Sequence, residues 1–128
     1  MGLFSRTRSG VTQASFTPVD GEQLFVGEMS YQPHLTNLLV GLGYSTASLT
    51  TCTQPVSETF VARLVPEPRN PHDPNAVAVQ IEGRTAAYLS RANAARYRAA
   101  FRSQTGEMRV VLWVKPQGKG IVSVWPER

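Results

Sequence analysis

Length, composition and charge already exclude several kinds of protein. The chain has 128 residues, 41% of them hydrophobic, and a net charge of +4, which suits one domain with its own core. No apolar run approaches the roughly 18 residues that a membrane-spanning helix needs, so we expect no membrane partner. The single cysteine, Cys52, excludes an internal disulfide and a cysteine metal cluster, and a reducing, cytoplasmic compartment fits best.

The positive charge comes mainly from arginine. Eleven of the thirteen basic residues are Arg, whose planar guanidinium suits bidentate phosphate contact and stacking on bases. Together with a sequence pI of about 9.7, this favours a polyanionic partner such as a nucleic acid. It does not identify the partner, because a G+C-rich genome produces the same bias.

The first 20 residues are expected to form a flexible N-terminal tail, followed by one domain over residues 21–128. The tail is rich in Ser, Thr and Gly, contains Arg6 and Arg8, and shows no hydrophobic period. A basic arm that clings to DNA is the alternative interpretation. The apolar residues Val11 and Phe16 favour packing of the last part of the tail on the domain.

The first part of the domain predicts a strand, a helix and a loop. Residues 23–28 have the composition of a strand, and Pro33 suits the first turn of a helix. Four leucines at helical spacing predict the buried face of this helix: Leu35, Leu38, Leu39 and Leu42. Gly41 or Gly43 is expected to end it. The Ser- and Thr-rich residues 44–55 predict a loop or an irregular edge strand.

Two strands joined by a long loop are predicted next. Residues 57–65 and residues 76–81 show the period-2 pattern of strands. Residues 82–84, Glu-Gly-Arg, predict a hairpin turn into a third strand, Thr-Ala-Ala-Tyr-Leu. Residues 65–79, called the hook below, therefore join two strands without a helix between them.

Prolines stiffen the hook. Each of them fixes φ, removes an amide donor and pushes the preceding residue toward extended geometry; they are Pro66, Pro68, Pro71 and Pro74. Asn70 and Asp73 each precede a proline, and their short side chains can bond nearby backbone amides. Two interpretations stay open: these side chains only satisfy the amides of a rigid turn, or the hook presents them to a ligand.

The last part of the chain predicts a helix and a closing hairpin. Ser90 suits the N-cap of a helix over residues 91–102, with Ala94, Tyr97 and Phe101 on its buried face. Its later arginines are interpreted as solvated, namely Arg96, Arg98 and Arg102. The fold class predicted from all elements is mainly β with two helices, in the order β-α-β-β-β-α-β-β. Six strands of this kind form a small OB-like or SH3-like barrel.

The hook and the strand after it resemble the signature of the HIRAN domain family. The string L-V-P-E-P-R-N-P-H-D-P-N-A-V-A-V, followed by G-R-T-A-A-Y-L-S-R, is similar to the family's E-P-x-N-P-x-D-x-N-A-I-x-V hook and its G-x-x-x-G-Y-L strand. Upstream, F-V-G-E-M-S-Y-Q-P-H-L resembles the family's first strand and the turn into its first helix. The resemblance covers residues 22–125 and implies a stand-alone, bacterial or phage-type member with an OB-like barrel.

The resemblance also implies a function. HIRAN domains of eukaryotic DNA-repair translocases bind single-stranded DNA with a free 3′ hydroxyl, so the implied ligand is such a strand and its 3′ end. By resemblance, Asp73 would accept a hydrogen bond from the 3′ hydroxyl, and Asn70 would help to bind the end nucleotide. His72 would stack on the base, Arg91 would contact a phosphate, and Tyr88 would add a polar or stacking contact. A separate helicase or nuclease is the expected partner enzyme.

The sequence departs from the family pattern at three positions. Ser30 and Tyr31 stand where the DNA-end reader of the family has two aromatic residues, so one stacking surface is missing. His72 stands in place of Tyr, and Ala87 replaces the usual Gly before Tyr-Leu. Ser30 and Tyr31 still belong to the expected DNA-binding site. Stacking of a base on an aromatic ring is worth about 1–3 kcal/mol, so weaker binding is expected.

Two other functions remain open. A protein-interaction or scaffold domain would keep the fold without binding a DNA end. A hydrolase or nuclease that uses His72 and Asp73 is the weakest hypothesis, because the two residues are adjacent in a proline-locked loop. No second carboxylate cluster, metal-ligand spacing or phosphate-binding glycine loop supports it. We therefore expect a protein that is not an enzyme and needs no metal or cofactor; its oligomeric state is not predicted.

Overall fold

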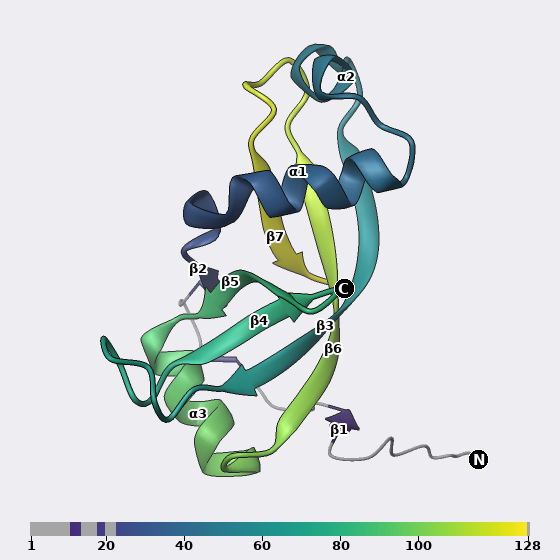
Figure 1. The fold of residues 1–128 in the computed structure, drawn as a ribbon. Coiled ribbons are helices and arrows are strands. Elements are labelled where there is room, and N and C mark those ends of the chain that lie inside the picture. The colour runs from purple at the N-terminus through teal and green to yellow at the C-terminus, as the bar shows by residue number, and fades with distance from the viewer. Residues whose placement is uncertain (1–10, 14–17, 20–22, 128) are drawn as a thin grey trace, which may run out of the picture.

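The fold is formed mainly by β-strands. The computed structural model describes residues 11–13, 18–19 and 23–127. In this part of the chain the elements are β1 (Val11–Gln13), β2 (Phe25–Val26), η1 (a 3-10 helix, Glu28–Tyr31), α1 (Gln32–Gly41), α2 (Thr46–Thr51), β3 (Val56–Pro66), β4 (Val77–Ile81), β5 (Arg84–Leu89), α3 (Arg91–Phe101), β6 (Thr105–Val114) and β7 (Val122–Pro126). Figure 1 shows how they are arranged.

Six antiparallel strands form a nearly closed barrel. They follow one another in the order β7, β6, β3, β4, β5 and β2, each hydrogen-bonded to the next. β1 pairs in parallel with the start of β6, on the same edge along which β7 lies farther on. The predicted fold class, a mainly β protein with a small OB-like barrel, is confirmed.

The long strand β3 connects the two halves of the barrel. It pairs with β6 from Val56 to Leu64 and with β4 from Arg63 to Pro66. Its side chains alternate as predicted, since Ala62 and Leu64 are fully buried whereas Val61 is 50% exposed. The largest fully buried side chains of the core come from most elements of the chain: Tyr97, Phe25, Leu35, Leu39, Leu49, Leu64, Ile81 and Leu112.

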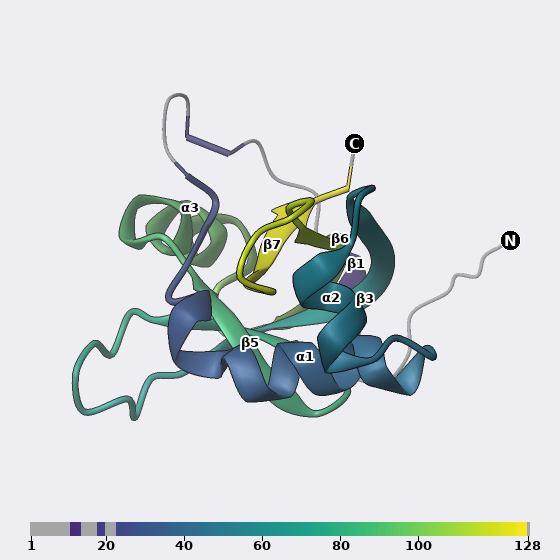
Figure 2. The same ribbon diagram turned by 90° about the horizontal axis from the view of Figure 1, so that it is seen from above.

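Two helices lie on opposite sides of the β4–β5 hairpin, α1 above it and α3 below it in Figure 1, and Figure 2 shows the same arrangement from above. α1 buries Leu35, Leu38 and Leu39, as predicted. Leu42, the fourth leucine of the predicted buried face, is 54% exposed. Leu42 is the residue that caps α1 at its C-terminal end.

A third helix, α2, replaces the loop or edge strand predicted for residues 44–55. The Ser45 hydroxyl accepts from the Ser48 amide and the Ser48 hydroxyl accepts from the Ser45 amide, both at 3.0 Å, which is a capping box. Leu49 anchors the helix in the core and is 1% exposed. The prediction was wrong because α2 contains a single leucine among Ser, Thr and Ala residues. Such a segment shows no hydrophobic period that would indicate a helix.

The N-terminal strand is shorter than predicted, and part of the expected tail contacts the domain. Of residues 23–28, only Phe25 and Val26 form β2, because Gly27 takes the left-handed conformation at φ 81° and η1 begins directly after it. Most of the expected tail lies outside the described residues. Within the described part, residues 11–13 form β1, and the Val19 amide donates to Asn93 Oδ1 at 2.9 Å.

Side chains close the gap between the two ends of the barrel sheet. Gln32 Nε2 donates to the Val122 carbonyl at 2.8 Å, and Gln32 Oε1 accepts from the Val122 amide at 2.9 Å. A neighbouring antiparallel strand would form the same pair of hydrogen bonds with the Val122 backbone. Glu28 Oε2 accepts from the Val124 amide at 3.4 Å. The start of α1 is thereby fixed against β7.

α3 begins at Ser90, as predicted. The Ser90 hydroxyl accepts from the Asn93 amide at 3.3 Å and from Asn93 Nδ2 at 2.9 Å, while the Ser90 amide donates to the Leu24 carbonyl at 2.9 Å. In the helix, the fully buried Tyr97 donates its hydroxyl to the Gln104 carbonyl at 2.7 Å. These contacts fix the direction in which α3 leaves the end of β5.

Replacing Gln32 tests how much the closure contributes to stability. Gln32→Ala removes both bonds to Val122, so we expect the free energy of unfolding to fall by about 1–3 kcal/mol, measured by urea denaturation. Gln32→Glu keeps an acceptor for the Val122 amide and should give an intermediate loss. Asn37→Ala, at an exposed position of the same helix, is the control. An equally large loss in the control would contradict the closure role.

Tyr97 gives the fold a pH dependence in alkaline solution. Burial raises the pKa of Tyr97 to about 12, against the opposing effect of a hydrogen bond from the Gly106 backbone. The unfolded state loses this proton first, so the contribution of Tyr97 to stability is complete below pH 10.0 and is lost as the pH rises toward about 12. We expect a smaller decline of the unfolding free energy over this range in Tyr97→Phe. An identical decline in both proteins would refute the prediction.

Candidate nucleic-acid interface

The part of the hook between β3 and β4, residues 67–76, projects from the barrel at the end where α3 begins (Figure 1). Two side chains shape its turn, as the sequence predicts. Asn70 Oδ1 accepts from the backbone amides of His72 at 2.8 Å and Asp73 at 3.1 Å. Asp73 Oδ1 accepts from the Asn75 amide at 2.9 Å. Side-chain hydrogen bonds therefore fix the turn in addition to the prolines.

Glu67 connects the hook to β5. Its Oε1 accepts from Asn70 Nδ2 at 3.0 Å and from the Tyr88 hydroxyl at 2.8 Å. Its backbone amide donates to the Ala76 carbonyl at 2.9 Å, and its carbonyl accepts from the Asn70 amide at 3.0 Å. Hydrogen bonds to an ionised acceptor are stronger than neutral ones. Glu67 therefore holds both arms of the hook and β5 in one arrangement.

Two tyrosines form an aromatic wall beside the hook. Tyr31 at the end of η1 and Tyr88 on β5 have ring centroids 6.3 Å apart and planes tilted by 43°, which is a favourable arrangement of aromatic rings. Burial raises the pKa of Tyr88 above its usual value of 10.0, and the hydrogen bond to Glu67 raises this pKa further. Tyr88 consequently keeps the hydroxyl proton that it donates to Glu67 into alkaline solution.

These residues surround one pocket, called the end pocket below. It lies between the hook, η1, β5 and the start of α3, and its volume is about 510 Å³. Six of the seven predicted DNA-binding residues line it: Tyr31, Asn70, His72, Asp73, Tyr88 and Arg91. The fold therefore brings together at one place residues from four segments of the chain.

Ser30 is the predicted site residue that does not line the end pocket. It is exposed in η1, and its amide donates to the Gly27 carbonyl at 3.1 Å. Successive residues of a 3-10 helix point in directions about 120° apart, so Ser30 and Tyr31 do not share a face. A role for Ser30 in binding DNA rests on the resemblance alone.

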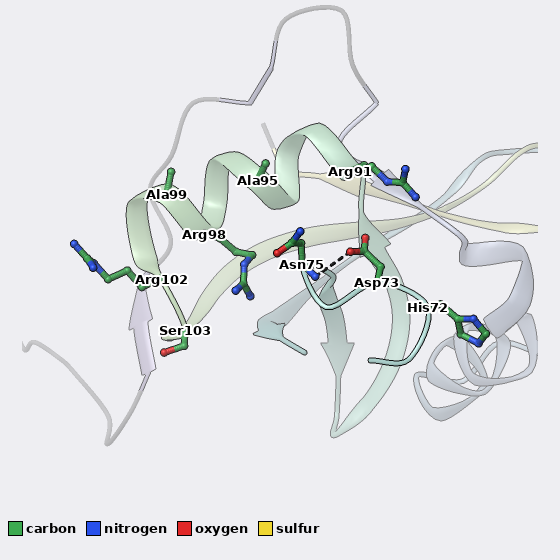
Figure 3. A pocket seen from close by; sticks show the side chains of 9 residues that line it. All are labelled: His72, Asp73, Asn75, Arg91, Ala95, Arg98, Ala99, Arg102 and Ser103. Atoms are coloured by element: carbon green, nitrogen blue, oxygen red, sulfur yellow. Dashed lines mark hydrogen bonds between the residues drawn. The ribbon is translucent and has the colours of Figure 1, made fainter. Parts of the chain in front are cut away.

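Asp73 has one carboxylate oxygen left for a ligand. The first oxygen binds the Asn75 amide, and Figure 3 shows the carboxylate directed toward the start of α3, where Arg91 lies. Within the described residues, the second oxygen has no hydrogen-bond partner and Arg91 forms no ion pair. An acceptor and a cation thus border the same space without neutralising each other.

A second hollow, the α3 groove, continues from the end pocket along α3 (Figure 3). Its volume is about 900 Å³, and it shares His72, Asp73 and Arg91 with the end pocket. The rest of its lining comes from the hook, from α3 and from the residues after α3: Asn75, Ala95, Arg98, Ala99, Arg102 and Ser103. Three arginines therefore border the α3 groove.

Arg98 differs from the solvated side chain that the sequence predicts. It is half-buried and points from α3 toward Asn75 of the hook (Figure 3). Its Nη1 is buried and has no hydrogen-bond partner in the described part of the protein. Arg102 is exposed at the end of α3, as predicted. The groove thus contains one guanidinium that is partly removed from water without a partner.

Sequence reasoning missed the roles of Glu67 and Arg98. Glu67 stands between two prolines directly after a strand, where a carboxylate can reach donors on the paired strands. Arg98 follows Arg91 by seven residues, and residues two helical turns apart lie on the same face. The sequence contains both features, but they could be interpreted only once the position of the hook relative to β5 and α3 was known.

Comparisons with known proteins provide no relative for this chain. No model of a protein family, no curated protein and no solved structure matches it.

Among the residues that the structure describes, no group of three or more His, Cys, Asp or Glu side chains is arranged to hold a metal ion. Over the same ranges, no helix has both the length and the apolar character required to cross a bilayer.

Replacing Asn70 tests its part in the shape of the hook. Asn70→Ala removes the acceptor for the His72 and Asp73 amides, so we expect these amides to exchange hydrogen about fivefold faster or more, since each bond contributes about 1 kcal/mol. NMR hydrogen exchange measures this directly. Asn70→Asp keeps the acceptor but places a carboxylate oxygen against Glu67 Oε1, to which Asn70 Nδ2 donates at 3.0 Å, so only part of the protection should remain. Asn75→Ala, at an exposed position of the hook, is the control. Equal exchange in Asn70→Ala and Asn75→Ala would contradict the prediction.

Proposed function

We propose that this protein binds single-stranded DNA and holds the 3′-hydroxyl end of the strand in the end pocket. The observation that supports the proposal best is the convergence of six predicted residues around that pocket. A terminal nucleotide needs a surface for its base, an acceptor for its hydroxyl and a cation for its phosphate. The Tyr31–Tyr88 pair, Asp73 and Arg91 supply these three groups side by side.

Asp73 is the residue that distinguishes the two kinds of strand end. Its second carboxylate oxygen accepts a hydrogen bond from a 3′ hydroxyl, whereas a carboxylate repels a 3′ phosphate. Asn70 acts mainly through the shape of the hook, because its side chain already binds two amides and Glu67. His72 is exposed at the tip of the hook and flanks the terminal base.

The resemblance of the hook to the HIRAN signature supports the same function. It adds a setting, DNA repair, in which a separate helicase or nuclease acts on the strand that this protein holds. Binding through stacking, hydroxyl and phosphate contacts reads no base edge, so the proposed recognition tolerates any base at the 3′ end.

An exposed apolar patch favours a second function, protein interaction. It lies on the outer face of β6 and β7, where Val111 pairs with Trp125, and Trp125 is 48% exposed. Together with Trp113 and Pro126, these residues line a hollow of about 480 Å³. Exposed aromatic groups of this kind are typical of contact surfaces between proteins. A scaffold domain would use this patch and leave the end pocket without a DNA ligand.

The proposal predicts that binding depends on the chemistry of the 3′ end. A 5′-labelled oligo-dT with a 3′ hydroxyl is compared with the same strand carrying a 3′ phosphate, by fluorescence anisotropy at low and moderate salt. We expect a preference of about tenfold or more for the hydroxyl, because a hydrogen bond to a charged group contributes about 1.5–3 kcal/mol. Asp73→Asn keeps an acceptor for the Asn75 amide and removes the charge, so most of the preference should disappear.

The matched control is Glu82→Gln, which removes a carboxylate from the exposed β4–β5 turn and should leave the preference unchanged. Equal binding of both strands by the unmodified protein would refute the recognition of the 3′ end. If neither strand shows salt-dependent binding, the protein-interaction function is favoured instead.

A further inference from the structure

The α3 groove is a continuation of the end pocket rather than a separate hollow. His72, Asp73 and Arg91 line both, so a chain that leaves the end pocket on this side enters the α3 groove. The hook forms one wall of the groove and α3 forms the other (Figure 3). A ligand longer than one nucleotide would therefore run along α3.

The charges of the groove are arranged along this direction. Arg91 and Arg98 lie seven residues apart in α3, which corresponds to roughly 10 Å along a helix, and Arg102 follows directly after α3 ends at Phe101. None of the three forms an ion pair with another residue of the described ranges. Among the described residues, Asp73, at the end where the two hollows meet, is the one acidic side chain that lines the groove. The remaining length of the groove is therefore positive.

Arg98 provides the most specific observation. Its Nη1 is buried and has no hydrogen-bond partner among the described residues, and a buried donor of a charged group is costly unless an acceptor satisfies it. The side chain points across the groove toward the hook (Figure 3). Arg98 lines the groove, so an anionic oxygen there would meet the accessible part of the guanidinium and gain the strength of a charge-assisted contact.

The side chains between the arginines leave space for a ligand backbone. Ala95 and Ala99 line the groove on the same helix, and their short side chains allow a close approach to α3. A guanidinium matches the geometry of a phosphate in a bidentate contact, and the neighbouring aromatic wall suits a base better than a peptide carboxylate. These features favour a nucleic acid strand over an acidic polypeptide as the ligand.

We propose that the α3 groove binds the successive backbone phosphates of a single nucleic acid strand, with Arg98 and Arg102 as phosphate-binding residues. This inference rests on the proposed function and extends it, because a strand whose 3′ end lies at Asp73 runs toward its 5′ side past Arg91, Arg98 and Arg102 in turn. The groove thereby gives the bound strand a fixed polarity on the protein. Binding strength then depends on strand length beyond the terminal nucleotide.

The test combines a length series with arginine variants. Oligo-dT strands of about three and about ten nucleotides with 3′ hydroxyls are titrated by fluorescence anisotropy at several salt concentrations. For the longer strand, we expect Arg98→Gln and Arg102→Gln each to weaken binding about fivefold or more and to lower the slope of log K against log salt by about 0.7. The trinucleotide and the preference for a 3′ hydroxyl should be nearly unaffected. Arg98→Lys keeps the charge but loses the planar fork and should give a smaller loss.

Arg84→Gln is the matched control, because Arg84 is an exposed arginine at the far end of β5. If Arg98→Gln and Arg102→Gln behave like Arg84→Gln while the unmodified protein still distinguishes 3′ ends, this inference is refuted and the proposed function stands. If the arginine and length effects appear without any discrimination of 3′ ends, the groove is supported and the end recognition fails. Poly-glutamate is also tested as a competitor of oligo-dT at equal charge. If it competes with the unmodified protein and its binding is lost in Arg98→Gln as much as that of oligo-dT, the groove binds acidic polypeptides and the inference is overturned.

Discussion

The two hydrogen bonds that Glu67 Oε1 accepts join the parts of the candidate site. One comes from Asn70 in the hook and the other from Tyr88 on β5, whose ring contacts Tyr31. Two residues after Tyr88 the chain reaches the Ser90 cap that starts α3. A hydrogen bond to a charged acceptor contributes about 1.5–3 kcal/mol, so one carboxylate helps to hold the hook and the aromatic wall in one arrangement. Both the end pocket and the α3 groove depend on that arrangement.

In the side chains of the candidate site, some atoms hold the shape of the hook and others stay available for a ligand. Asn70 uses its side chain almost entirely inside the hook, whereas Asp73 uses one oxygen for the turn and keeps the other. The guanidinium of Arg98 stays without an ion-pair partner within the described residues. The polar atoms that form hydrogen bonds within the protein hold the unbonded polar atoms in place. A ligand would therefore meet a preorganised site, and its binding would cost little further conformational entropy.

The parts of this fold that follow from local chemistry were predictable, and those that depend on distant contacts were not. Period-2 patterns predicted the strands, and the residue types of Asn70 and Asp73 predicted the hydrogen bonds of the hook. α2 was missed because its place is set by one buried leucine, and the closure by Gln32 was missed because Val122 lies 90 residues away. The resemblance to HIRAN domains assigned Tyr31 and Tyr88 to the same expected site, but the contact between their rings could not be read from spacing. Arg98 could be recognised only once the hook lay opposite α3.

The closure at Gln32 has a consequence for how the barrel behaves among other chains. An edge strand with unpaired amides and carbonyls is a template onto which a second chain can add, and this is a common start of aggregation. Gln32 occupies both backbone groups of Val122, and Glu28 occupies the amide of Val124. The segment that carries Tyr31 to the end pocket therefore also blocks this edge of β7 against edge-to-edge pairing.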